Sequence, residues 1–175
     1  MRTRTLITLL TLITTMTYTQ TQIDTEFRGF WVDGFNEGFH TPEEVETLLR
    51  RVRNANMNAV IVQMRKRGDA HYLSPLEPFA SNQKPNFDAL AYLIEKAKSE
   101  TPPIEVHVWV NCHPIWPGSG WPSDPKHILN RAPEIQTENF EGERITEVGY
   151  GMDWGHPLAN EWFARVVLDI VRRYD

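Results

Sequence analysis

The stretch IEVHVWVNCHPIW, from Ile104 to Trp116, decides how the rest of the chain is interpreted. Its valines alternate with polar and aromatic residues, which predicts a β-strand that is apolar on one face only. Because successive side chains on a strand point to opposite faces, His107, Trp109 and Asn111 share the face opposite the valines. Polar and aromatic groups of this kind bind ligands, so we interpret their face as one wall of a binding cleft.

Two more strands precede this one, and a helix follows each of the three. We expect the other strands over residues 27–33 and 58–65, and the helices over 41–56, 86–100 and 157–174. Thr41 is suited to cap the first helix, and Glu44 to complete a capping box. Apolar residues at helical spacing predict one buried stripe on each helix. The stripes are Val45, Leu48, Leu49 and Val52; Leu90, Leu93, Ile94 and Ala97; and Phe163, Val166, Val167, Ile170 and Val171.

Strands that alternate with helices pair in parallel, which predicts an α/β fold. An open doubly wound sheet and a closed (β/α)8 TIM barrel both have this order. Neither G-x-G-x-x-G nor a P-loop follows any strand, so the sequence gives no support to a nucleotide-binding sheet. In a barrel, the strand residues that alternate with the apolar, helix-facing ones point inward, and the last residue of each set lies at the mouth of the barrel. These sets are Gly29, Trp31 and Asp33; Ile61, Gln63 and Arg65; and His107, Trp109 and Asn111.

Two long loops follow the second and third strands, at residues 66–86 and 112–156. Loops of this length in a compact domain are usually functional or disordered. The second loop is rich in aromatic residues, so we expect an ordered flap whose flat rings suit sugars. The alternative is that its tryptophans only pack the loop onto the barrel. Its aromatic residues include Trp116, Trp121, Tyr150 and Trp154.

The N-terminus has the layout of a secretory signal, with Arg2 and Arg4 before a short apolar run and small polar residues. We expect a signal peptide over residues 1–19, a linker over 20–26, and a secreted or periplasmic protein. The apolar run is too short for stable membrane insertion. The chain carries a net charge of −5, which disfavours a nucleic-acid partner. Cys112 is its only cysteine, so it has no internal disulfide.

The domain over residues 27–175 is short for a barrel, which typically has about 250 residues. We therefore expect the N-terminal portion of a TIM barrel, about three βα units, truncated before its fourth strand.

Several runs resemble the glycosyl-hydrolase-like family 10 domain in their order and spacing. They are FRGFWVDGFNEGFHTPEEVETLLRRVRNANMNAVIVQMRKRGDAHY, EVHVWVN, DPKHILNRAPEI and YGMDWGHPLANEWFARVVLDIVRRYD. The resemblance extends from Phe27 to Asp175. It implies a secreted or envelope (β/α)8-barrel enzyme related to glycoside hydrolases, and some members are implicated in cleaving peptidoglycan glycan strands. It also implies a next strand of the form D-G-I-x-F-D, so the catalytic residues are expected after Asp175.

Glycoside hydrolysis normally needs two carboxyl groups, one protonated and one ionised. Asp33 ends the first strand and is either a substrate contact or a structural partner of Arg65; beside an arginine it would stay ionised. Asp153 either reaches the cleft or sets up the turn before the last helix. The basic run from Arg65 to Arg67 could meet an anionic cell-wall polymer. The expected substrate-binding residues are Asp33, Gln63, Arg65, His107, Trp109, Asn111, Trp116 and Asp153.

We therefore predict a glycoside hydrolase whose substrate is a polysaccharide, the glycan of bacterial cell-wall peptidoglycan, and which needs no cofactor. One alternative is a non-catalytic carbohydrate-binding protein on the same scaffold, and another is a metal-dependent polysaccharide deacetylase or esterase. Asp69, His71, His107 and His113 are conceivable metal ligands. The first strand lacks paired histidines and H-E-x-x-H is absent, so we expect no metal. We expect the full-length protein to be the enzyme and this chain alone to be inactive. A further alternative is that the chain is inert and poorly folded in isolation.

Overall fold

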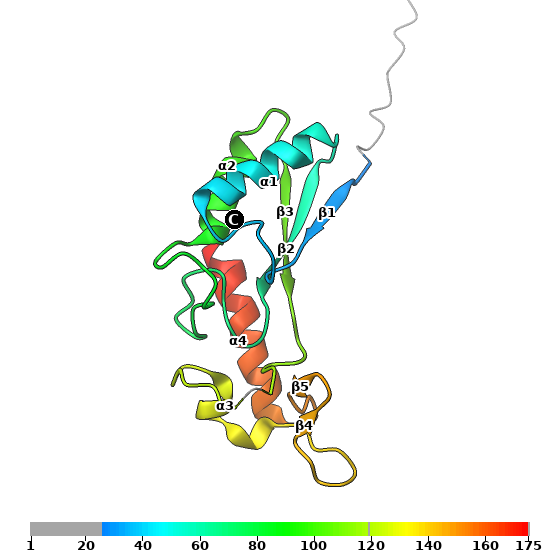
Figure 1. Ribbon diagram of the computed structural model, residues 1–175, viewed down its shortest axis with the longest axis vertical. Coiled ribbons are helices and arrows are strands. Elements are labelled where there is room, and N and C mark those ends of the chain that lie inside the picture. The colour runs from blue at the N-terminus through cyan, green and yellow to red at the C-terminus, as the bar shows by residue number, and fades with distance from the viewer. Residues whose placement is uncertain (1–25, 119, 175) are drawn as a thin grey trace, which may run out of the picture.

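The computed structural model describes residues 26–118 and 120–174 (Figure 1). The predicted signal peptide and nearly all of the predicted linker lie outside the described residues. The described chain has two parts, which we call the sheet lobe (residues 27–111) and the loop lobe (residues 112–156). Helix α4, Pro157–Arg173, runs along both.

The sheet lobe is built on three parallel strands in the order β1-β2-β3. They are β1, Gly29–Val32; β2, Ala59–Arg65; and β3, Glu105–Val110. Trp31 lies level with Ile61, and Ile61 with His107. The pairing of β2 with β3 shifts register between Gln63 and Arg65, as at a β-bulge. The predicted α/β architecture with parallel strands is confirmed, and it is consistent with part of a TIM barrel.

Helices α1, Pro42–Asn54, and α2, Ala89–Ser99, cover one face of this sheet (Figure 1). The predicted stripe of α1 is buried at all four positions, and three of the four predicted residues of α2 are buried, Ile94 being half-buried. These stripes pack on the apolar strand residues, because the burial of apolar surface is the main term that stabilises the packing of helices on a sheet. The strand side of this core includes Val32, Val60, Val62 and Met64.

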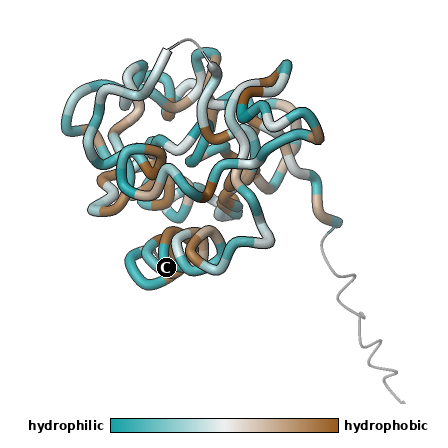
Figure 2. The backbone as a smooth tube through the Cα atoms, turned by 90° about the horizontal axis from the view of Figure 1, so that it is seen from below, coloured by the Kyte–Doolittle hydropathy of each residue, from teal (hydrophilic) through white to brown (hydrophobic). Residues whose placement is uncertain are grey.

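Helix α4 buries only part of the predicted stripe, and it also buries Trp162, which was not predicted. Trp162, Val166 and Ile170 are buried, whereas Val171 is 67% exposed. The reason is that α4 serves two cores: Trp162 and Val166 pack in the loop lobe, and Ile170 reaches the core of the sheet lobe. Seen from below in Figure 2, α4 lies on one side of the remaining chain, with hydrophilic and hydrophobic residues alternating around it.

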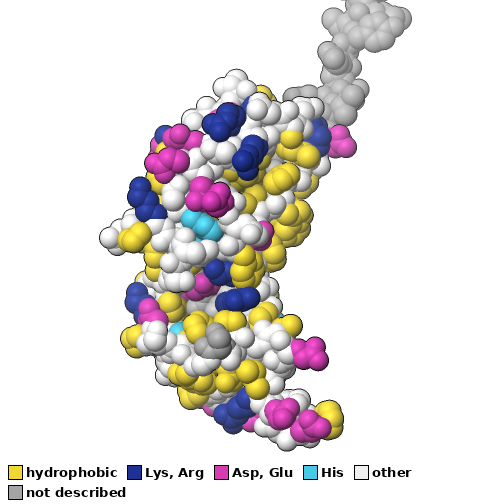
Figure 3. All heavy atoms as spheres, viewed as in Figure 1, with side chains coloured by type: hydrophobic (Ala, Val, Ile, Leu, Met, Phe, Trp, Pro, Cys, Tyr) yellow, Lys and Arg dark blue, Asp and Glu magenta, His cyan; other side chains and the backbone are white. Residues whose placement is uncertain are grey.

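The loop lobe is ordered and has its own core, as predicted for the long segment after β3. It contains the short helix α3, Ile128–Arg131, a 3-10 turn at Pro133–Ile135, and the hairpin of β4, Ile145–Thr146, and β5, Gly149–Tyr150. Its buried residues include Ile115, Ile128, Leu129, Ile135 and Met152. In Figure 3 the surface narrows between the two lobes, and basic side chains gather at this waist.

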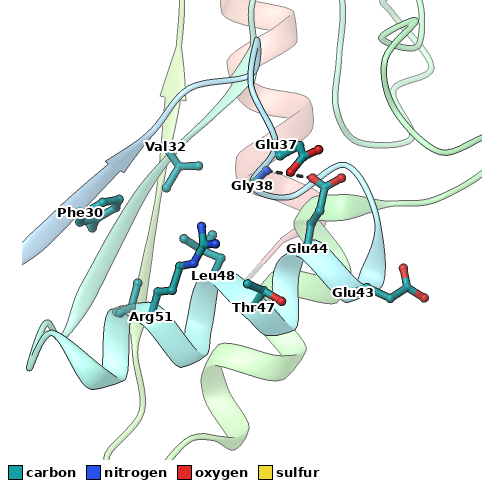
Figure 4. A pocket seen from close by; sticks show the side chains of 10 residues that line it. Phe30, Val32, Glu37, Gly38, Glu43, Glu44, Thr47, Leu48 and Arg51 are labelled. Atoms are coloured by element: carbon teal, nitrogen blue, oxygen red, sulfur yellow. Dashed lines mark hydrogen bonds between the residues drawn. The ribbon is translucent and has the colours of Figure 1, made fainter.

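The N-terminus of α1 closes the end of the β1–α1 loop. The Thr41 hydroxyl accepts a hydrogen bond from the Glu44 amide at 3.2 Å, as the predicted cap requires. The Glu44 carboxylate, however, accepts from the amides of His40 at 2.8 Å and Gly38 at 2.9 Å, rather than from Thr41 (Figure 4). The predicted capping box is therefore shifted toward the loop, because the curled loop presents those two amides to the carboxylate.

Both edges of the sheet carry an apolar groove. The groove beside β1 has a cavity volume of about 310 Å³ and lies between Phe30, Val32 and the α1 residues Leu48 and Val52 (Figure 4). A second groove separates β3 from the end of α4 and is lined by Val106, Val108 and Ile170, among others. In residues 26–118 and 120–174, β1 and β3 each have a strand partner on one side only. No helix in the same ranges is long and apolar enough to cross a membrane.

Candidate functional site

The sheet face opposite α1 and α2 carries an aromatic wall. The rings of Trp31 and Trp109 meet edge to face, with centroids 5.3 Å apart, and Trp31 is 63% exposed. The ring of Phe27 meets His107 in the same way at 5.2 Å. This is the face that the alternation of residues in the third strand predicted. His107 lies in the open rather than in a core, with its Nε2 atom 3.1 Å from the Glu105 carboxylate.

Asp33 ends β1 and holds the following loop. Its Oδ1 atom accepts hydrogen bonds from the amides of Phe35 at 2.8 Å and Asn36 at 3.0 Å, and from the Asn36 side chain at 3.1 Å. Burial by itself raises the pKa of Asp33, but these hydrogen bonds outweigh it and lower the pKa. The group is therefore an ionised carboxylate and is unsuited to act as the general acid of a glycosidase.

Arg65 pairs with Glu77, and the predicted pair with Asp33 is wrong. Its Nε atom donates to both Glu77 oxygens at 2.8 and 2.9 Å, and Nη2 lies 2.7 Å from Oε1. Nη1 donates to the Asn111 carbonyl at 2.5 Å, and Cζ lies 5.7 Å from the ring centroid of Phe163 on α4. Burial disfavours the charged guanidinium, but Glu77 reverses that effect and raises the pKa of Arg65.

Arg65 has no exposed surface, so the predicted direct contact with a substrate does not fit its position. It instead joins the ends of β2 and β3 to the loop after β2 and to α4. Gln63, which is 2% exposed, has a similar role, because its Oε1 atom accepts from the Gly34 amide at 2.9 Å. Asn111 is half-buried and donates to the Lys66 carbonyl at 3.0 Å. The three strand ends therefore meet, although two of the predicted contact residues lie beneath the surface.

Sequence reasoning did not assign Phe35 to the site and noted Lys66 and Arg67 only as a basic run. Phe35 is 48% exposed, and its ring centroid lies 4.7 Å from Cζ of Arg67 and 5.3 Å from Nζ of Lys66. Lys66 is buried and donates to the Gly34 carbonyl at 3.2 Å and to Asn82 at 3.0 Å. The run of three basic residues was the available signal, but only the structure shows that each member has a different environment.

Two buried histidines lie under the β1–α1 loop. The rings of His40 and His71 stack with centroids 5.2 Å apart, and Nδ1 of His71 lies 2.9 Å from the side-chain Oε1 atom of Gln83. Burial lowers the pKa of His71 to about 4, so the ring is neutral near pH 7. A Cβ atom on Gly34 would lie 2.7 Å from Nε2 of His71, so the loop and the ring fit closely.

Trp116 and Asp153 belong to the loop lobe and not to the strand ends. Nε1 of Trp116 donates to the Gly120 carbonyl at 2.8 Å, and its ring packs on His127 at 5.1 Å. His127 links the lobes, because its Nε2 atom lies 3.0 Å from the Ile115 carbonyl and 3.3 Å from the Arg67 carbonyl. Asp153 accepts from the Gly155 amide at 2.8 Å and sets the turn before α4, which was the alternative to a cleft role.

Metal ligands are not gathered at this site or elsewhere in residues 26–118 and 120–174. Over these ranges, no group of three or more His, Cys, Asp or Glu side chains is arranged to hold a metal ion. The conceivable ligands His71 and His107 are also separated, the first buried under the loop and the second exposed on the aromatic wall.

Comparison with known proteins agrees with this architecture. The sequence model of the family described as "Glycosyl hydrolase-like 10" matches residues 26–175. The chain is also similar to a protein named "Glycosyl hydrolase YngK" from Bacillus subtilis (strain 168), with 25% identity over 173 residues. That alignment covers 88% of this chain and 32% of the relative, so the chain spans about a third of the relative's length. The chain belongs to the glycosyl hydrolase-like 10 family.

Proposed function

We propose that this chain forms the substrate-binding front part of an exported glycoside hydrolase that cleaves the glycan strands of bacterial peptidoglycan. The family membership supports a glycoside hydrolase-related role. The single observation that carries the proposal is the pair of exposed Trp31 and half-buried Trp109 beside the polar strand ends. Sugar rings have apolar C–H faces and polar hydroxyl rims, so an aromatic wall beside hydrogen-bonding groups suits them.

The roles of the individual residues follow from their exposure. Trp31, Trp109 and the exposed His107 offer direct contacts to a sugar, and half-buried Asn111 lies at the rim. Gln63 and Arg65 are buried beneath these contact residues, and they hold the Gly34 amide and the Asn111 carbonyl in place. Binding of this kind orients the glycan and does not itself break a bond.

The acid/base pair is proposed to lie on the polypeptide outside this chain. Two carboxyl groups must flank the scissile bond, about 5 Å apart for retention or roughly 6.5–9.5 Å apart for inversion. At the mouth, Asp33 is occupied by three N–H donors, Glu77 is buried against Arg65, and Asp69 lies 3.8 Å from Lys66. Each of these three carboxyl groups already has a partner within the chain, which supports placing the acid elsewhere.

The test compares two proteins: the 175-residue chain, and the longest polypeptide of the same coding sequence that contains this chain. Purified peptidoglycan glycan strands are the substrate, and the release of reducing ends is measured. We expect turnover by the longer polypeptide and binding without turnover by the chain alone. Turnover by the chain alone would contradict the placement of the acid/base pair.

The same assay separates the alternatives. Binding without hydrolysis by both polypeptides would support a non-catalytic carbohydrate-binding protein. Acetate release that is lost on chelation would support the metal-dependent deacetylase. Export is tested separately by locating the processed protein after cell fractionation.

A further inference from the structure

The guanidinium of Arg67 stands apart from the other cations at the mouth. Arg65 is paired with Glu77, and Lys66 lies 3.8 Å from Asp69 and is buried. Arg67 is half-buried, and no Asp or Glu among the residues that the structure describes forms an ion pair with it. Its charged group is therefore available to a ligand.

The position of Arg67 is nevertheless well defined. Its amide donates to Asp69 Oδ1 at 2.8 Å, and its carbonyl lies 3.3 Å from Nε2 of His127 in the loop lobe. The guanidinium lies over the Phe35 ring at 4.7 Å, and Phe35 is held through its amide by Asp33. A side chain fixed in this way loses little freedom when it binds, which favours affinity.

We propose that Arg67, supported by Phe35, binds a free carboxylate carried by a sugar of the glycan substrate, which on muramic acid requires a strand without its stem peptide. The inference rests on the proposed function and names one chemical feature of its substrate. A guanidinium matches a carboxylate with two parallel N–H bonds, and the pair is stronger than a neutral hydrogen bond. The exposed Phe35 ring beside it offers the apolar contact that the rest of the sugar requires.

The charge around the site is consistent with this selectivity. The chain has a net charge of −5, the ionised Asp33 accepts from the Phe35 amide, and Asp69 accepts from the Arg67 amide. An anionic glycan would be repelled by such a surface unless a free cation received it. Arg67 provides that cation where the two lobes meet, because its carbonyl lies beside His127 of the loop lobe.

The test measures binding of matched oligosaccharides to the 175-residue chain by calorimetry. One is a tetrasaccharide of alternating N-acetylglucosamine and N-acetylmuramic acid, and the second is the same compound with its carboxyl groups reduced to alcohols. A chitin tetrasaccharide supplies the neutral backbone, and a tetragalacturonate supplies a carboxylate from a uronic acid. We expect the carboxylated muramic compound to bind about tenfold or more tightly than its reduced form.

Substitutions test whether Arg67 causes the preference for the carboxylated compound. Arg67→Ala should remove the preference, and Arg67→Lys should keep only part of it, because lysine cannot make the bidentate contact. Arg131→Ala is the matched control, since it removes a guanidinium that lies 4.6 Å from the Trp162 ring in the loop lobe. The control should leave the preference unchanged. Circular dichroism of each variant checks the fold, and Arg67→Gln replaces Arg67→Ala if the latter unfolds.

Each outcome decides a different claim. Equal affinity for the carboxylated and reduced compounds, or a preference that survives in Arg67→Ala, overturns the role of Arg67 but leaves the proposed function standing. Tighter binding of tetragalacturonate than of the muramic compound supports carboxylate recognition and contradicts peptidoglycan as the source. Failure of the folded chain to bind any of the four compounds overturns both proposals.

Discussion

The sheet lobe and the loop lobe reach a stable arrangement in different ways. The sheet lobe buries regular stripes from α1 and α2 against one face of three strands. The loop lobe has mostly irregular backbone, and its core joins Ile115, Met152 and Trp162 from distant points of the chain. The sheet lobe also contains a buried ion pair, Arg65–Glu77, whereas the loop lobe has a close backbone approach at Gly149. The comparison can be tested with substitutions of decreasing expected effect.

The largest effect is expected from Glu77→Ala. This change leaves the Arg65 guanidinium, which has no exposed surface, without its carboxylate, and should lower the free energy of unfolding by about 3–5 kcal/mol. Urea denaturation measures the loss. The matched control is Glu138→Ala in the loop lobe, whose pair with Arg144 is also 2.7 Å long but about half exposed, and which should cost under about 1 kcal/mol. Similar losses in both variants would contradict the role given to the buried pair.

Acidification should weaken the sheet lobe through His71. The folded pKa of about 4 lies below the ordinary 6.5, so the unfolded chain binds the proton more readily between these values. Stability from this group is complete above pH 6.5 and falls by about 3 kcal/mol as the pH drops to about 4. Urea denaturation across this pH range, in the wild type and in His71→Gln, separates the effect of His71 on the free energy of unfolding from the effect of the carboxylates. Parallel pH curves for the two proteins would show that His71 does not carry it.

Gly149→Ala should disturb the loop lobe. Residue 149 has a φ of +114°, and an added Cβ would lie only 1.9 Å from the Trp116 carbonyl, so the hairpin must move. We expect a loss of about 2 kcal/mol and a change in tryptophan fluorescence. Gly142→Ala is the control, because its φ of +83° is also positive but its added Cβ meets nothing within 4 Å. A smaller loss is expected there, about 1 kcal/mol. An equal loss at both glycines would mean that the close approach to Trp116 is unimportant.

Thr41→Ala should have the smallest of these effects. It removes the side-chain acceptor for the Glu44 amide at the start of α1, which typically costs about 1 kcal/mol. Thr47→Ala, inside the same helix, removes a hydroxyl that caps nothing and should be close to neutral. Thermal unfolding of the two variants gives the comparison, and equal melting temperatures would remove Thr41 as a cap.

Much of the sheet lobe could be predicted because its signals are local. The four apolar residues of α1 recur at helical spacing, and all four are buried. The alternation around Trp109 predicted a face shared with Trp31, and the two rings meet there. The stripe on α4 was partly misplaced at Val171, because a helix that contacts two cores does not follow a single period.

The candidate site was only partly predictable, because the partner of a charged side chain depends on which loop comes near it. Asp33 and Arg65 end neighbouring strands, yet the loop after β2 brings Glu77 to Arg65, and Asp33 binds amides of its own loop. The exposure of Phe35 follows from the same loop paths, as does the lack of an ion pair at Arg67 within residues 26–118 and 120–174.

The sequence by itself determined the parallel α/β architecture, the helix start at Thr41, the aromatic wall and the family of the chain. These properties depend on periodicity, capping chemistry and motif order, all of which are read within a few tens of residues. Only the tertiary structure decided that Arg65 is buried against Glu77, that His71 is neutral under Gly34, and that the Arg67 guanidinium lies over Phe35. Burial and ion pairing are set by contacts between segments far apart in the chain, and no local pattern specifies them.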